Sequence, residues 1–216
     1  MGKSSGGLDP RIERSQSAII AAAFDQFMAR GYVRASIDDI AEQAGTSKKT
    51  VYNVFGDKER LFRAVVGQAI RIAEDYSSHT AKALSEVSDV EPHLRTAVVE
   101  LAETVLTGPV IGLRRLLISE VDRFPEFAAE YYARAPGLVM RTLASTLHTL
   151  SAEGKLDIGD DALAAEQLAF LAMGPGIDRA LFRPSSHPAE SISTIREAAH
   201  AGVDAFLSIY PPQRDR

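Results

Sequence analysis

Apolar residues recur at three- and four-residue spacing through most of the chain, and this helical period leaves few folds open. No stretch shows the alternation of β-branched and polar residues that is typical of a half-buried strand. Prolines fall near the starts of the periodic segments or at kinks, where the missing N–H of proline does least harm. The sequence therefore predicts an all-α protein. Beyond the first 80 residues, the predicted helices span about residues 91–107, 110–122, 125–150, 161–182 and 188–209.

The composition excludes several classes of chemistry. Of the 216 residues 45% are hydrophobic, which is ample for packed cores, and the absence of cysteine excludes disulfides, thiolate nucleophiles and zinc–thiolate sites. The first residues contain no apolar run that would act as a signal peptide, and no segment approaches the roughly 18 uninterrupted apolar residues of a membrane helix. We therefore expect a soluble, cytoplasmic protein with no membrane partner.

The charge is unevenly distributed along the chain. The net charge is −5, but residues 1–64 carry ten Lys or Arg against eight Asp or Glu, so this part has a charge of +2 and the remainder −7. A small basic module on an acidic body is typical of a DNA-binding protein with a separate regulatory domain, although many enzymes are equally asymmetric.

A short arm and one helix precede the first capping signal. Residues 1–9 are rich in Gly and Ser, without an apolar pattern, and are interpreted as a disordered arm. The first helix begins near Pro10 and is expected to end at Gly31. Its apolar stripe consists of Ile19, Ile20, Ala23, Phe24, Phe27 and Met28.

Two further helices follow at once, each with its own start signal. The hydroxyl of Ser36 can cap the free N–H groups of a second helix, and Asp39, three residues on, is expected to reciprocate as in a capping box. This helix stops at Gly45, which can adopt the left-handed conformation that a sharp turn requires. Ser47 then caps a third helix that runs to about Phe55.

A fourth helix, capped by Asp57, carries apolar residues at helical spacing over a length sufficient to connect two domains. The chain is therefore divided into four parts. These are a disordered arm (1–9), a helix-turn-helix DNA-binding domain (10–56), a connecting helix (57–80) and a C-terminal helical domain (81–216).

The third helix has a polar outer face near its start. It offers cations for phosphates, an amide for bidentate readout of adenine, and a hydroxyl and a phenol for backbone oxygens. These side chains are Lys48, Lys49, Thr50, Tyr52 and Asn53, of which Tyr52 also fits a core position. Two helices joined by a tight glycine turn, the second short and polar outside, form the unit that lays a recognition helix in the major groove.

The run ASIDDIAEQAGTSKKTVYNVFGDKERLF, from Ala35 to Phe62, resembles the DNA-binding domain of the TetR repressor family. The resemblance extends back through Phe24, Phe27 and the Gly31-Tyr32 pair and covers about residues 14–66. In the C-terminal part, the runs LRRLLISE and RFPEF look like the AefR-like branch of this family.

The resemblance implies which residues contact double-stranded operator DNA. Base or phosphate contacts are implied for Lys48, Lys49, Thr50 and Asn53, and backbone contacts for Tyr52, Ser36 and Lys58. Lys58 stands at a helix start that itself favours a phosphate. The implied DNA-binding set is Ser36, Thr46, Lys48, Lys49, Thr50, Tyr52, Asn53 and Lys58. The chain departs from the commonest pattern at Asn53 and Val54, where histidine and an aromatic residue are frequent.

The family architecture further implies a homodimer in which the last two long helices of each subunit form a four-helix bundle. Their apolar residues exceed what a lone domain edge should expose. The expected interface residues are Leu168, Leu171, Ile195, Ala199, Val203 and Phe206. The operator is then expected to be a pseudo-palindrome, and Phe206→Asp is expected to separate the subunits and weaken DNA binding.

An apolar effector pocket is a further expectation for the C-terminal domain, although aromatic and Met residues at helical spacing are more often core. The candidate ligand-binding residues are Tyr132, Met140, Phe170 and Met173. The Arg114-Arg115 pair is interpreted as surface salt bridges rather than a ligand anchor. The Gly174-Pro175-Gly176 run fits either a bend in a helix or a loop between two shorter helices.

The histidines are scattered, without an i, i+4 pair, so no metal effector and no cofactor are expected.

The favoured function is a repressor that a small molecule releases from its operator. A small helical enzyme is an alternative, but the sequence has no GxSxG, P-loop or GxGxxG motif, and an enzyme is not expected. A DNA-binding architectural protein without any effector is the third interpretation.

Overall fold

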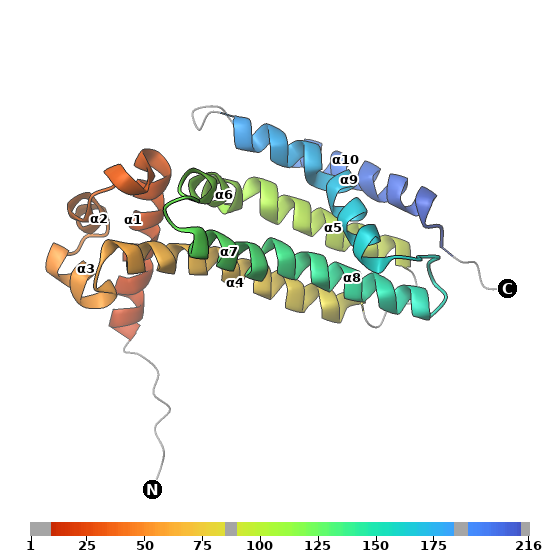
Figure 1. Ribbon diagram of the computed structural model, residues 1–216, viewed down its shortest axis with the longest axis horizontal. Helices are drawn as coiled ribbons and strands as arrows, with labels where there is room; N and C mark the ends of the chain where they lie inside the picture. The colour runs from red at the N-terminus through yellow and green to blue at the C-terminus, as the bar shows by residue number, and fades with distance from the viewer. Residues whose placement is uncertain (1–9, 85–89, 184–189, 213–216) are drawn as a thin grey trace, which may run out of the picture.

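The structure, a computed structural model, describes residues 10–84, 90–183 and 190–212, and the predicted arm at 1–9 lies outside these ranges. The described residues form ten α-helices and no strand, which confirms the all-α prediction. The helices are α1 (Pro10–Arg34), α2 (Ile37–Gln43), α3 (Lys48–Phe55), α4 (Lys58–Leu84), α5 (Val90–Thr107), α6 (Val110–Ser119), α7 (Pro125–Arg134), α8 (Pro136–Ala152), α9 (Asp161–Phe182) and α10 (Ile192–Ile209). Figure 1 shows α1, α2 and α3 gathered at one end of an elongated molecule, with α4 running lengthwise away from them.

Most helix boundaries agree with the sequence prediction, and the differences have local causes. The segment expected at 125–150 is two helices, α7 and α8, which meet at Ala135 and Pro136. Proline disfavours a helical conformation in the residue before it and has no N–H for the helix, so Ala135 leaves the helical region and Pro136 starts a new helix. The last helix begins at Ile192 rather than 188, because the Ser191 hydroxyl accepts a hydrogen bond from the Thr194 N–H at 3.1 Å and so caps it.

Two other local expectations are resolved by the backbone. α1 is broken at Gly31, whose φ of 74° lies outside the helical region, although a last turn continues to Arg34. α9 runs without interruption from Asp161 to Phe182, with Pro175 inside it, so the interpretation of Gly174-Pro175-Gly176 as a loop is wrong.

Two apolar clusters fill the subunit, and they do not follow the predicted division of the chain. One lies among α5, α6, α8, α9 and α10. The other joins α1 to α4 with side chains of α6 and α7, so the core of the helix-turn-helix end includes residues well beyond position 80. In this second cluster Phe124, just before α7, packs edge-on against Tyr32 with ring centroids 4.7 Å apart and lies 5.5 Å from Phe62.

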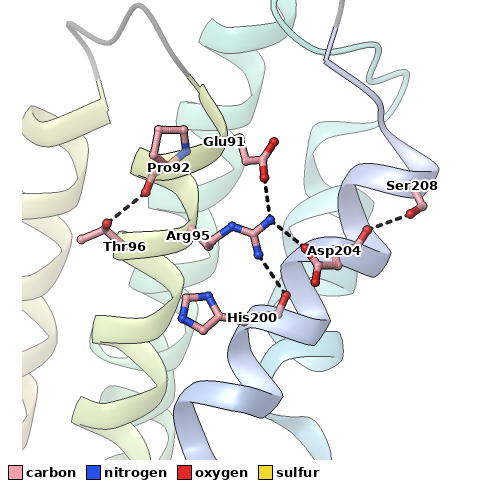
Figure 2. Close-up of polar contacts among 7 residues, drawn as sticks. All are labelled: Glu91, Pro92, Arg95, Thr96, His200, Asp204 and Ser208. Carbon is pink, nitrogen blue, oxygen red and sulfur yellow. Dashed lines mark hydrogen bonds and ion pairs between the residues drawn. The ribbon is translucent and has the colours of Figure 1, made fainter.

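A charged group fastens α10 to α5 beside the first cluster. The Arg95 guanidinium on α5 donates to Glu91 and to Asp204, both at 2.7 Å, and to the His200 carbonyl at 3.4 Å. Figure 2 shows Arg95 reaching across to Asp204 and His200 on α10. These hydrogen bonds, with the apolar contacts beneath them, hold α10 against its own subunit.

The expected dimer-interface residues are therefore mostly core residues, and the prediction was wrong for five of the six. α9, α10 and α5 pack against one another within one chain, so the apolar stripes of α9 and α10 face their own subunit. A side chain without exposed surface in the subunit has none to offer to a second one. The buried five, each at most 1% exposed, are Leu168, Ile195, Ala199, Val203 and Phe206. Leu171 differs, since 41% of its surface is exposed.

Candidate nucleic-acid interface and effector cavity

The turn between α2 and α3 is built around Gly45. Its φ of +64° is left-handed, as the sequence predicts, and residues with a side chain rarely adopt this conformation. The chain reverses within a few residues because the Gly45 N–H donates to the Glu42 carbonyl at 3.0 Å and the Thr46 N–H to the Ala41 carbonyl at 2.9 Å. This turn fixes the angle at which α3 leaves α2.

The caps of these helices agree with the sequence prediction except at one residue. Ser47 Oγ accepts from the Thr50 N–H, and Ser36 Oγ from the Asp38 N–H, both at 3.1 Å. Asp39 does not complete a capping box with Ser36, since its carboxylate forms an ion pair with Arg30 on α1. The Asp39 carboxylate, which was expected to cap the start of α2, therefore links α2 to α1 instead.

α3 presents one apolar face inward and a polar face to solvent. Val51 is 1% exposed and packs into the N-terminal core, whereas Tyr52 is 43% exposed and is not the core residue that its chemistry also allowed. Lys49 and Asn53 are exposed, and Phe55 at the end of the helix is half-buried. The amide, phenol and cation of α3 are thus available on one outer surface at the end of the molecule.

Lys48 has a partner in the free protein. Its ammonium donates to the Asp38 carboxylate at 2.9 Å, and this hydrogen bond raises the pKa of Lys48. Both side chains are more than half exposed, so water screens the pair and a DNA phosphate can replace Asp38 at small loss. This pairing could not be predicted from spacing along one helix, because the two residues belong to different helices.

The hydroxyl residues of the predicted set have mainly local roles in the free protein. Thr50 Oγ1 lies 2.9 Å from Ser47 Oγ, and the hydroxyl oxygen of Ser36 caps α2. Thr46 is half-buried in the turn. These side chains border the outer surface of α3.

Lys58 stands at the first position of α4 and is held against α1. Its ammonium donates to the Val33 carbonyl at 3.2 Å and lies 4.7 Å from the centroid of the Tyr32 ring. Partial burial lowers the pKa of Lys58, and burial raises the pKa of Tyr32. Lys58 is thus oriented by the end of α1.

A separate cavity lies in the other part of the molecule. It has a volume of about 390 Å³ and is bordered by side chains from α4 to α9. The four candidate ligand-binding residues, Tyr132, Met140, Phe170 and Met173, all lie in its wall. Met173 is buried, whereas Tyr132 and Phe170 are 67% and 68% exposed.

Sequence reasoning missed most of the cavity wall, including residues of α4 and a charged residue of α6. α4 contributes Ala69, Ile72, Ala73 and Tyr76, so the connecting helix forms part of the wall. Arg114 on α6 is a further wall residue, so its interpretation as part of a surface salt bridge was wrong. The available signal was its spacing, since Arg114 follows Val110 by four residues and so continues the apolar stripe of α6.

Arg115 turns away from this stripe to α9. It donates from Nη2 to the Ala180 carbonyl at 2.7 Å, which ties α6 to the last turn of α9. Glu120, the acid nearest to these arginines in the sequence, binds Arg123 at 3.1 Å.

Family comparison agrees with this arrangement at both ends of the chain. Residues 19–65 match the family described as bacterial regulatory proteins, tetR family, and residues 92–212 match the AefR-like transcriptional repressor C-terminal domain. The chain belongs to the TetR family. Both the family and the AefR-like branch inferred from the sequence are thereby confirmed.

Individual relatives and solved structures are described as regulators as well. The chain is 36% identical over 129 residues to the HTH-type transcriptional activator FasR of Mycolicibacterium smegmatis, a match that covers 60% of this chain and 57% of FasR. A crystal structure of a TetR-family transcriptional regulator from Mesorhizobium loti is 32% identical with a TM-score of 0.81, covering 94% of this chain and 99% of that one. The Flavonoid-responsive Regulator FrrA is 25% identical with a TM-score of 0.65, covering 94% and 100%.

As a TetR-family protein, the chain is a DNA-binding transcriptional regulator, and α2 and α3 form its helix-turn-helix. In the described ranges no single helix is long and apolar enough to cross a membrane, and only the bent pair of α5 and α6 reaches that length and composition together.

Proposed function

We propose that the protein is a homodimeric repressor that binds a pseudo-palindromic operator and releases it when a small molecule occupies the cavity. The observation that supports this mechanism is the position of α4. The helix begins with Lys58 beside the DNA-binding end, and the same helix contributes Ile72 and Tyr76 to the cavity wall. An occupant that moved α4 would therefore move the start of α4 and the helices packed on it.

The contacts of α4 make such coupling physically reasonable. Leu61 and Phe62 in its first turns are fully buried in the N-terminal core, so α1 to α3 must follow a displacement of this segment. A dimer reads two half-sites only when its recognition helices are about 34–36 Å apart. A small change in the tilt of α4 in each subunit is thus enough to spoil that spacing.

Dimer formation would use a different surface from the one expected from the sequence. Apolar side chains remain exposed on α9 and α10, and a second subunit would remove them from water. They are Leu163, Phe170, Leu171, Phe182, Ile192 and Ile209. We therefore assign the subunit interface to this outer face.

The DNA part of the proposal is tested by selecting bound fragments from genomic DNA and measuring their affinity at several salt concentrations. Lys48→Ala and Lys58→Ala should both weaken binding, and each should reduce the salt slope by roughly one phosphate contact. Lys155→Ala, which removes the same charge from the turn after α8, is the matched control. Binding that ignores salt, or that falls equally in all three variants, would contradict the proposal.

The regulatory part is tested with the selected operator and a reporter gene. Apolar small compounds that raise the melting temperature of the protein should release it from the operator, and repression in the reporter strain should be lost when they are added. Because FasR is named as an activator, the reporter also decides the direction of control. Transcription that rises with protein concentration would overturn repression while leaving DNA binding intact.

A further inference from the structure

The charge of the cavity wall identifies the kind of ligand that fits it. Among the described residues that line the cavity, Arg114 alone carries a charge, and none is acidic. The rest of the wall is made of aliphatic, aromatic and methionine side chains, with a few hydroxyls. We propose, on the basis of the ligand-controlled function above, that the cavity takes a small amphiphile whose single anionic group pairs with Arg114.

The guanidinium of Arg114 has no anionic partner among the residues that the structure describes. Within the described ranges no hydrogen bond or ion pair reaches it, and its Nε is buried without a hydrogen-bond acceptor. A guanidinium is always charged, and its burial without an acceptor is unfavourable. An anion in the cavity would supply two acceptors in the fork geometry that a guanidinium prefers.

The acids closest in sequence do not supply this partner. Glu120, six residues after Arg114 and just beyond the end of α6, already pairs with Arg123. Arg115, the adjacent residue, is anchored to the Ala180 carbonyl and so cannot take the place of Arg114 without releasing α9. The positive charge of the wall therefore stays uncompensated by these neighbours.

The remainder of the cavity suits an apolar body. Its volume of about 390 Å³ lies within the range of small-molecule sites. Met140 and Met173 are flexible and polarizable, so they can adapt to an irregular apolar chain or ring. The phenol of Tyr76, which also borders the cavity, donates to the Ala97 carbonyl at 3.0 Å and is not a free donor for the ligand.

The experiment compares three probes of equal chain length, octanoate, 1-octanol and octylammonium, by isothermal titration calorimetry at pH 7.5. The wild-type protein should bind octanoate at least about ten-fold more tightly than 1-octanol, and octylammonium most weakly. In Arg114→Met the affinity for octanoate should fall to that for 1-octanol, whose own affinity should hardly change. Arg114→Lys should keep part of the preference, because the charge remains without the fork.

Arg141→Met is the matched control, since it removes an exposed guanidinium of α8 that is not part of the wall. Operator binding and melting temperature verify that each variant is folded. An unchanged octanoate preference in Arg114→Met, or equal binding of octanoate and 1-octanol to the wild type, would overturn the inference and leave ligand control standing. Binding of none of the three probes, with no release of operator by other apolar compounds, would overturn both.

Discussion

The polar outer face of α3, here called the reading surface, and the paired helices α9 and α10 differ in how well their residue types predict what they contact. α3 has only eight residues, yet its outward face is a set of polar groups that match the chemistry of duplex DNA. α9 and α10 are longer and carry many apolar residues at helical spacing, a pattern that fits a core, an interface or a cavity wall equally well. A polar side chain specifies what it binds, whereas an apolar stripe specifies only that something covers it.

The largest effect is expected where this ambiguity misled the sequence prediction. Phe206→Asp should prevent stable folding rather than dissociate a dimer, because Phe206 is fully buried in its own subunit. Loss of a buried Phe alone costs about 3–5 kcal/mol, a large part of the stability of a typical domain, and the buried carboxylate adds to this. Chemical denaturation measures the loss.

Leu171→Asp is the partner variant on the exposed side of the same pair of helices. We expect it to keep the melting temperature of the subunit within a few degrees, to lower the dimer fraction in light scattering, and to weaken operator binding, because Leu171 is 41% exposed in the subunit. Soluble, folded Phe206→Asp protein that is merely monomeric would restore the original interpretation of these stripes.

A smaller effect is expected at the reading surface. Asn53→Ala should lower operator affinity by about 1–3 kcal/mol and relax the preference at one base pair in each half-site, since an amide can read adenine through two hydrogen bonds. Asn53 is exposed, so folding should be unaffected. Affinity measured on operators substituted at each position tests this. An equal loss on every sequence would make Asn53 a backbone contact.

The smallest effect is expected at the ion pair between Lys48 and Asp38. Asp38→Asn should raise operator affinity by less than about 1 kcal/mol, because it removes a competing carboxylate from an exposed and therefore weak pair. The gain should shrink as salt is added, since screening already weakens the pair. A lower affinity for DNA at unchanged melting temperature would show that Asp38 positions Lys48 instead of competing for it.

The features that sequence reasoning recovered depend on neighbouring residues. The caps at Ser47 and Asp57, the left-handed Gly45 and the ends of α9 follow from residues within one turn of the feature. Local backbone rules fix such features whatever the rest of the fold does. The break before Pro136 was also local, but the apolar period that continues across it obscured it.

The features that were missed depend on segments distant in sequence. Asp39 pairs with Arg30 across two helices, and Lys48 with Asp38 likewise, so neither partner is visible from spacing along one helix. The burial of Phe206 depends on α5, more than ninety residues earlier in the chain. For Arg114, a charge on an apolar stripe was visible, but only the packed helices show that the stripe borders a cavity.

The second apolar cluster, which α1 to α4 share with α6 and α7, has a consequence for protein engineering. Tyr32 and Phe62 pack against Phe124 and Phe127, while the neighbouring Leu117 and Tyr131 contribute to both this cluster and the cavity wall. A chimera that joins this DNA-binding head to another sensor by a cut after position 80 would leave Phe62 against foreign side chains. A functional graft must keep residues 113–135 with the head, and new input specificity is better sought by substitution at the far wall, on α8 and α9.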